Sequence, residues 1–274
     1  MARSSRRSRR RSGNSAGLIV GAIALGLVSV AIIGAFGWLK YRASSTVAVD
    51  KASLCPVTGA TSETAILLDV TDPISDTTAL DLKNQFQQIV ARVPVGGAID
   101  IYSLTEKEGE PERTFHACNP GSGELTDEWT SNPRLIQDRW EKGFQKPLED
   151  IAGRLASGKA GDASPIMAGI QRINLEVFSS LPAGTPKALF VASDMIEHTP
   201  AFSNYRDGVA YSKFQKSEAR DKFRTSLDGV SVKILAFQRP NLKFSAEELA
   251  EFWKEWITKN NGYFDGFIRL EGKR

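Results

Sequence analysis

The sequence is poor in the residues that most often build metal centres and nucleophilic sites. It has only two cysteines and two histidines among its 274 residues. Cys55 and Cys118 stand far apart, so there is no C-x-x-C pair, which argues against a structural zinc site. There is no G-x-S-x-G motif and no histidine placed to serve a nucleophile, which argues against serine or cysteine hydrolase chemistry. The phosphate-binding spacing G-x-x-x-x-G-K-[ST] and internal repeats are also missing.

Positive charge is scarce once the start of the chain is set aside. The formal net charge is +3, but eight of the positive residues precede residue 43. These are Arg3, Arg6, Arg7, Arg9, Arg10, Arg11, Lys40 and Arg42. The charge of the remainder is −5, and a mildly acidic domain argues against nucleic-acid binding. By charge alone the arginines could form a nuclear or nucleic-acid-binding tail, but the apolar run that follows favours a role in membrane topology.

Charge is wholly absent from residues 13–39. A helix of that length is roughly 40 Å long, which exceeds the hydrocarbon core of a bilayer at about 30 Å. Trp38, Lys40 and Tyr41 lie at the far end of this stretch, where interfacial residues belong. Because the arginines precede the span, we expect a single-pass protein of a bacterial-type inner membrane. Its N-terminus is predicted to be cytoplasmic and its C-terminal domain periplasmic or extracellular.

Two kinds of export signal compete with this interpretation. A cleaved signal peptide would have a shorter apolar region and a small-residue cleavage site, which residues 43–45 match poorly. A twin-arginine export signal lacks its usual flanking pattern here. The predicted organisation is a basic cytoplasmic tail at 1–12, a transmembrane helix at 13–39, a linker or stalk at 40–59 and one folded domain at 60–274.

The two cysteines can form a disulfide if the domain lies outside the cytoplasm. Cys55 lies just before the first predicted strand, and Cys118 closes a later one. The bridge would close a long loop and stabilise the fold by up to roughly 4 kcal/mol. The alternative is two unrelated buried thiols. We predict the Cys55–Cys118 bridge because it agrees independently with the topology.

Strand and helix patterns alternate along the rest of the chain. Apolar runs predict strands near 65–69, 98–104, 113–118, 187–194, 232–238 and 264–270. Helical stripes lie between them, such as Leu82, Phe86, Ile89 and Val93, and Pro147 should kink another helix. The alternation predicts an α/β fold, a doubly wound and largely parallel sheet of about six strands with helices on both faces.

Two of the predicted strands end in a carboxylate. The run at 65–69 ends in Asp69, with Thr71 two residues later, and the run at 187–194 ends in Asp194. Ser164 opens a helix after a glycine-containing loop. In an open parallel sheet these residues can meet at the carboxyl edge. Such oxygen ligands suit Mg²⁺, Mn²⁺ or Ca²⁺. In the alternative, the same side chains only cap nearby helix N-termini.

The order of these elements resembles the von Willebrand factor A (vWA) family over about residues 60–270. In that family a first strand runs into D-x-S-x-S, a threonine comes from a later loop and an aspartate follows the fourth strand. Asp69, Thr71, Ser164 and Asp194 match four of these positions, whereas Pro73 replaces the third. The resemblance implies a metal-ion-dependent adhesion site for Mg²⁺ or Mn²⁺, completed by an acidic residue of a protein partner. It implies protein binding or assembly at the cell envelope and no catalysis.

A second resemblance points to a different class. Asp69 after a buried strand, Thr71, and Ser193 after a later strand have the outline of a haloacid dehalogenase-like phosphatase. There Asp69 would be the nucleophile and Mg²⁺ would clamp the phosphate. That family usually has D-x-D at the start, where this chain has Thr71 in the second position, and a later acidic pair that is not visible after Asp194.

Overall fold

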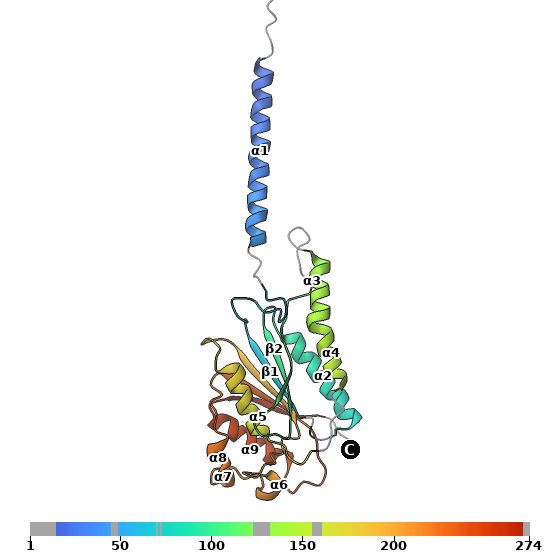
Figure 1. Ribbon diagram of the computed structural model, residues 1–274, viewed down its shortest axis with the longest axis vertical. Coiled ribbons are helices and arrows are strands. Elements are labelled where there is room, and N and C mark those ends of the chain that lie inside the picture. The colour runs from blue at the N-terminus through green and yellow to red at the C-terminus, as the bar shows by residue number, and fades with distance from the viewer. Residues whose placement is uncertain are drawn as a thin grey trace, which may run out of the picture. The chain divides into compact units, whose positions relative to one another are not determined.

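The computed structural model describes residues 15–44, 49–69, 71, 73–122, 132–154 and 161–270. They fall into two compact units, an N-terminal helix and the residues from 49 onward (Figure 1). The predicted basic tail at 1–12 and part of the predicted linker lie outside the described residues.

The N-terminal unit is helix α1, Ser15–Ser44. Within it, residues 19–41 have a mean hydropathy of 2.6 and are long and apolar enough to cross a membrane. The 30 residues of α1 correspond to about 45 Å of helix, which exceeds the roughly 30 Å of a hydrocarbon core. The helix contains residues 15–39 of the predicted span and continues to Ser44, and residues 13 and 14 lie outside the described residues.

The second unit is built on a six-stranded sheet in the order β3-β2-β1-β4-β5-β6. The strands are β1 Glu63–Asp69, β2 Ala98–Leu104, β3 Glu112–Cys118, β4 Lys187–Ser193, β5 Val230–Ala236 and β6 Tyr263–Arg269. All neighbouring pairs are parallel except β2 and β3. The central strand β1 is buried along its whole length, as expected for a strand covered on both faces.

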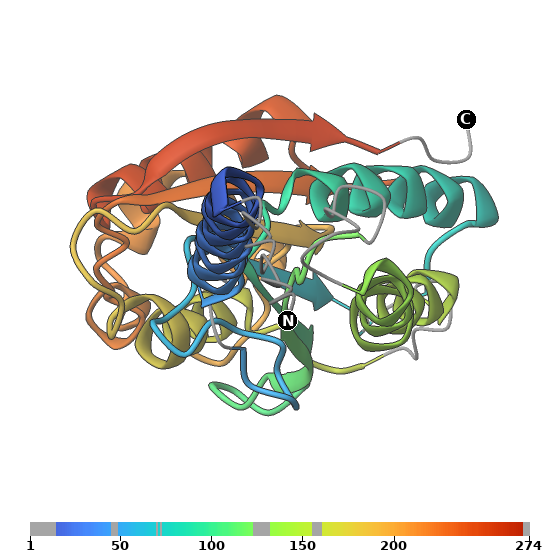
Figure 2. The ribbon, with the colours of Figure 1, turned by 90° about the horizontal axis from the view of Figure 1, so that it is seen from above.

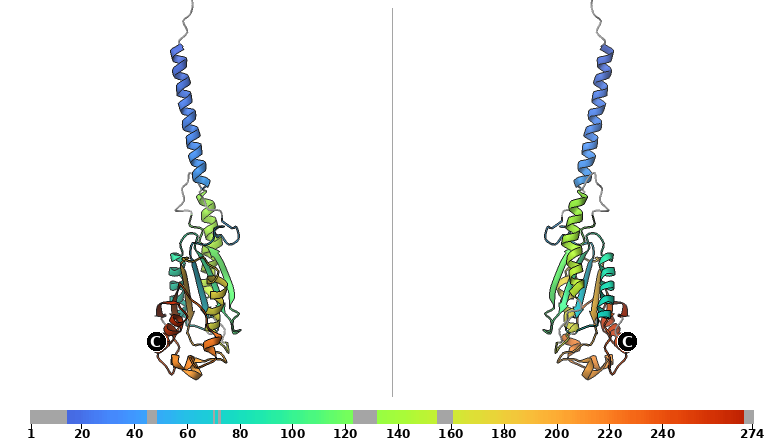
Figure 3. Two further views of the ribbon diagram at one scale, coloured as in Figure 1. Left: turned by 90° about the vertical axis from the view of Figure 1, so that its left-hand side faces the viewer. Right: turned by 90° about the vertical axis from the view of Figure 1, so that its right-hand side faces the viewer.

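Helices cover both faces of the sheet (Figures 2 and 3). One face packs against α2 Asp76–Arg92, α4 Lys146–Arg154 and the π-helical turn Glu141–Gln145 that links α4 to α3 Pro133–Trp140. The other packs against α5 Ile166–Ile173, the π-helical turn Asn174–Phe178 and α9 Ala246–Lys259. The short helices α6 Asn204–Asp207, α7 Tyr211–Phe214 and α8 Ala219–Lys222 precede β5. The predicted doubly wound α/β class is confirmed.

The helix expected to kink at Pro147 is interrupted just before that residue. The chain from 133 to 154 is helical throughout, but residues 141–145 make a π-helical turn. Proline lacks an N–H and clashes with the preceding turn, and a π-helical turn relieves such a clash. Phe144 in this turn is buried against the sheet.

A disulfide joins Cys55 to Cys118, with the two Cα atoms 4.7 Å apart, and confirms the predicted pairing. Cys118 ends β3 and lies opposite Ala98, the first residue of β2. The bridge therefore fastens the segment before β1 to the amino edge of the sheet, where the parallel strands begin.

Candidate functional site

Asp69 ends β1 at the carboxyl edge of the sheet, and both of its side-chain oxygens are fully used. Oδ1 accepts hydrogen bonds from the backbone N–H of Thr71 at 3.1 Å and from its hydroxyl at 2.5 Å. Oδ2 accepts from the hydroxyls of Ser164 at 3.0 Å and Ser193 at 2.7 Å. Four hydrogen-bond donors therefore surround the two oxygens of this one carboxyl group.

The sheet register explains why residues so distant in sequence meet here. Strands β1 and β4 are parallel neighbours, and Leu68 lies opposite Ala192. The next residues along, Asp69 and Ser193, therefore reach the same edge. Sequence reasoning connected Ser193 only with a phosphatase. Its role in holding Asp69 depends on the strand register, for which the only sequence signal was the end of a buried apolar run.

The loop before α5 is held so that Ser164 faces Asp69. Ser164 and His198 exchange two backbone hydrogen bonds, each 3.0 Å long. On the Thr71 side, the N–H of Gly161 donates to the carbonyl of Thr71 at 2.6 Å. A Cβ added at Gly161 would lie 2.5 Å from Oε1 of the exposed Glu106, whose side chain would have to shift. Ser164 does not cap α5, which was its alternative role, because its hydroxyl donates to Asp69.

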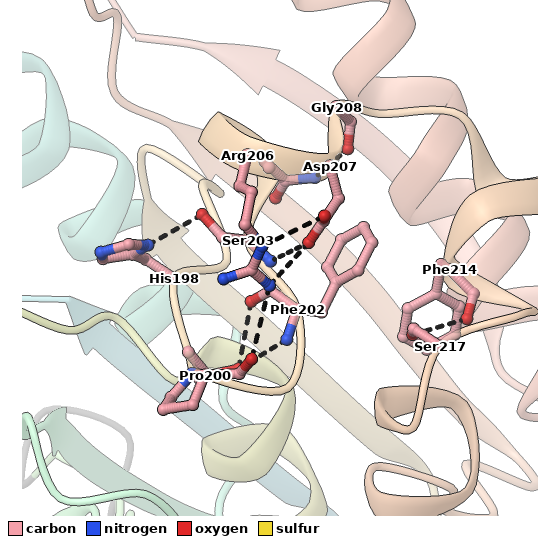
Figure 4. Close-up of polar contacts among 11 residues, drawn as sticks. His198, Pro200, Phe202, Ser203, Arg206, Asp207, Gly208, Phe214 and Ser217 are labelled. Atoms are coloured by element: carbon pink, nitrogen blue, oxygen red, sulfur yellow. Dashed lines mark hydrogen bonds and ion pairs between the residues drawn. The ribbon is translucent and has the colours of Figure 1, made fainter.

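The segment that pairs with Ser164 is itself folded tightly (Figure 4). His198 Nδ1 lies 2.8 Å from the hydroxyl of Ser203, and Asp207 accepts from the N–H of Ser203 at 3.0 Å. Arg206 in turn donates to Asp207 at 2.8 Å. These local bonds support His198, and through its backbone they fix the position of Ser164.

Buried Glu197 takes the capping place at the start of α5. Its Oε2 accepts from the N–H of Met167 at 2.9 Å, while Oε1 has no hydrogen-bond partner among the described residues. Burial raises the pKa of Glu197 to about 8. Burial thus favours the neutral form of Glu197 at the start of α5.

Asp194 follows β4 directly and is 5% exposed. Its Oδ1 accepts from the N–H of Ile196 at 2.9 Å. Burial, and next the negative charge of Asp69, raise the pKa of Asp194 to about 6. Met195, which follows, has a φ of 61°, a conformation that a bulky side chain rarely adopts. Hydrogen bonds hold it there, since its N–H donates to Ser193 Oγ at 2.8 Å and its carbonyl accepts from Trp253 at 2.7 Å.

Arg239 completes the arrangement and was not foreseen from the sequence. Its Nε donates to Asp194 Oδ2 at 2.9 Å, and its Nη1 donates to the carbonyl of Pro73 at 3.0 Å. Arg239 lies in the loop after β5, where an arginine reads as a solvated surface residue. Pro73 has no side-chain ligand to offer, but its carbonyl lies at the site through this contact.

Three of the four predicted ligands, Asp69, Thr71 and Ser164, belong to one hydrogen-bonded set. The negative charge of Asp69 contributes to the raised pKa of Asp194, which shows that the two carboxyl groups interact. Asp194 Oδ2, however, is ion-paired with Arg239. No group of three or more His, Cys, Asp or Glu side chains that could hold a metal occurs in the described parts of the chain. The donor set is instead two carboxylates and several hydroxyls, and these hard oxygen ligands fit Mg²⁺ or Mn²⁺.

No protein-family model and no curated protein matches this sequence. Among solved structures, the chain is similar to proximal thread matrix protein 1 from the mussel byssus, with 12% identity over 78% of this chain and 44% of that one and a TM-score of 0.41. The chain thus spans less than half of that relative's length. Another structure of the same mussel protein has a zinc-occupied adhesion-site motif.

Two bacterial structures are also similar in fold. One is BatB from Bacteroides thetaiotaomicron, with 16% identity, coverage of 77% of this chain and 91% of that one, and a TM-score of 0.38. The other is a von Willebrand factor type A protein from Catenulispora acidiphila, with 13% identity, coverage of 77% and 39%, and a TM-score of 0.40. These likenesses concern the fold alone, and we rest the functional assignment on the geometry of this chain.

Proposed function

We propose that this chain is a membrane-anchored, vWA-like protein-binding module that binds its partner at the carboxyl edge of the sheet. The observation that carries the proposal is the convergence of hydroxyls from three separate segments on Asp69, with Asp194 beside it. The three hydroxyls gather oxygen atoms from separate segments around one buried carboxylate, which is the kind of ligand set that a hard divalent cation prefers.

A divalent cation of the Mg²⁺ or Mn²⁺ type is part of this proposal. Asp69, Thr71, Ser164 and Asp194 would hold it through their oxygens. When bound, the ion would supply a positive centre that accepts a carboxylate from the protein partner. The chain's own part is to orient Asp69 through its four donors and to hold Ser164 in place through the His198 segment.

The proposed location is the inner membrane, with the N-terminus in the cytoplasm and the domain outside it. Six arginines precede the apolar helix, in agreement with the positive-inside rule. The Cys55–Cys118 disulfide is a second support, because such bonds persist in oxidising compartments. In intact cells, a membrane-impermeant maleimide should label neither cysteine until a reductant is added. Labelling of free thiols only after cell lysis would contradict this topology.

Calorimetric titration of the full-length chain in detergent with Mg²⁺ and Mn²⁺ tests the metal site. The wild type should bind, and Asp69→Asn should lose binding because its amide replaces an anionic ligand. Glu63→Gln is the matched control, since it makes the same acid-to-amide change in a buried side chain at the opposite end of the same strand. No binding by the wild type would overturn the metal-dependent function. Turnover of a generic phosphate ester that Asp69→Asn abolishes would favour the phosphatase alternative instead.

A further inference from the structure

The guanidinium of Arg239 is paired with one of the two carboxylates of the candidate site, Asp194. Of the two Asp194 oxygens, Oδ1 is used by the N–H of Ile196, and Oδ2 is held by Arg239 at 2.9 Å. The same guanidinium reaches the carbonyl of Pro73 at 3.0 Å. One side chain thus joins the Asp194 carboxylate to the loop that follows Asp69.

Two buried carboxylates side by side require a compensating positive charge. Asp69 is 8% exposed and Asp194 is 5% exposed, so water screens their repulsion poorly. A buried carboxylate near a like charge is stabilised when a cation pairs with it. Arg239 supplies that charge from the protein itself, through a charge-assisted hydrogen bond.

We propose that Arg239 is a tethered cation that competes with the divalent metal for Asp194 and must leave for the metal to bind fully. The inference rests on the metal-dependent function proposed above. Arg239 then sets the metal affinity of the site. While Arg239 is paired with Asp194, its positive charge balances the carboxylate, and Asp194 is not available to the metal.

The surroundings leave Arg239 room to move. Its side chain is 22% exposed. A cleft of about 250 Å³ beside it is lined by Asp194 and Arg239 itself, together with Leu242, Phe244 and Arg269. The released guanidinium can therefore turn into this cleft or into solvent. A partner's carboxylate that enters the cleft would meet Arg239 and would favour its departure from Asp194.

Mn²⁺ binding to the full-length chain in detergent tests the competition, with Arg239→Gln as the main variant. This variant lacks the charged hydrogen bond to Asp194 Oδ2, so the metal no longer has to displace it. Mn²⁺ binding should therefore tighten by about tenfold or more. Without metal, Arg239→Gln should melt at a lower temperature than the wild type, and Mn²⁺ should recover the loss. Arg239→Lys keeps a charge but cannot contact Asp194 and the Pro73 carbonyl with one planar group. Its Mn²⁺ affinity should therefore lie between those of the wild type and Arg239→Gln.

Arg269→Gln is the matched control, because it removes one positive charge from the same cleft without touching Asp194. Its Mn²⁺ affinity should stay within about twofold of the wild type, since exposed charges are screened. Wild-type binding that Arg239→Gln leaves unchanged or weakens would overturn the competition and leave the metal site standing. No Mn²⁺ binding by any of these proteins would overturn the metal site and the competition together.

Discussion

Strand β1 begins and ends in a buried carboxyl group, and its two ends are built differently. Glu63 at the amino edge is 5% exposed, and Asp69 at the carboxyl edge is 8% exposed. Each interacts with a second buried carboxyl group, Asp100 in the first case and Asp194 in the second. The difference lies in the donors. Asp69 accepts four hydrogen bonds, whereas Glu63 Oε1 accepts none from the residues that the structure describes.

Each end of β1 holds two interacting buried carboxyl groups, and the two ends accommodate them in opposite ways. Burial, and next the negative charge of Asp100, raise the pKa of Glu63 well above its ordinary value, so Glu63 stays protonated at neutral pH. Asp69 is instead surrounded by hydroxyls that suit a carboxylate. A buried acid at the end of a strand is therefore not in itself a site. The hydroxyl donors drawn from distant segments distinguish the candidate site from a structural acid.

The largest expected effect comes from cutting the disulfide at the amino edge. Replacing Cys55 and Cys118 together by serine should lower the free energy of unfolding by about 4 kcal/mol, because the unfolded chain regains the freedom of a long loop. Metal affinity should not change, since the carboxyl edge keeps its contacts. Urea unfolding followed by circular dichroism measures the first quantity and calorimetry the second. A large change in metal affinity would show that the two edges are not independent.

An intermediate effect should separate the two acids of β1. Asp69→Asn places an amide among hydroxyl donors and should cost about 2 kcal/mol of unfolding free energy at pH 7, because buried donors lose their acceptor. Glu63→Gln should not lower the unfolding free energy at the same pH, since the amide avoids the cost of keeping Glu63 protonated in the folded state. Urea titrations of both variants beside the wild type provide the comparison. Equal losses for the two variants would show that Asp69 and Glu63 do not differ in how the fold holds them.

A smaller effect should appear in the pH dependence of stability. Because the folded-state pKa of Glu63 is raised, the folded chain keeps a proton that the unfolded chain loses above a pH of about 4.3. The unfolded state then binds fewer protons, so stability falls as pH rises. Between pH 5.5 and 8.5, Glu63→Gln should remove at least about 1 kcal/mol of this fall. Parallel slopes for variant and wild type would show that Glu63 ionises normally.

The sequence predicts which strand ends form the site but not all of the side-chain contacts within it. Asp69 and Asp194 could be placed at one edge because each ends a continuous apolar run, and such runs become buried parallel strands. The disulfide could be predicted because only two cysteines exist and the topology permits oxidation. The position of Ser164 beside Asp69 also follows from the order of elements, since helices in such folds begin at the carboxyl edge of the sheet.

The contacts of Ser193 and Arg239 depend on information that the sequence does not display. Ser193 reaches Asp69 only because of the register between β1 and β4, and registers are set by the packed sheet as a whole. Arg239 lies far from Asp194 along the chain, and nothing in the pattern around it differs from a solvated turn. The contribution of Pro73 is missed for a related reason, because backbone carbonyls carry no sequence signal.

Counting bound Mn²⁺ by electron paramagnetic resonance of the free ion tests the central claim most directly. With the full-length chain in detergent and Mn²⁺ in excess, we expect one bound ion per chain for the wild type and for Glu63→Gln. Asp69→Asn should bind none, because the amide replaces the carboxylate around which the hydroxyl ligands gather. Equal binding by Asp69→Asn and the wild type, or no binding by the wild type, would contradict the account.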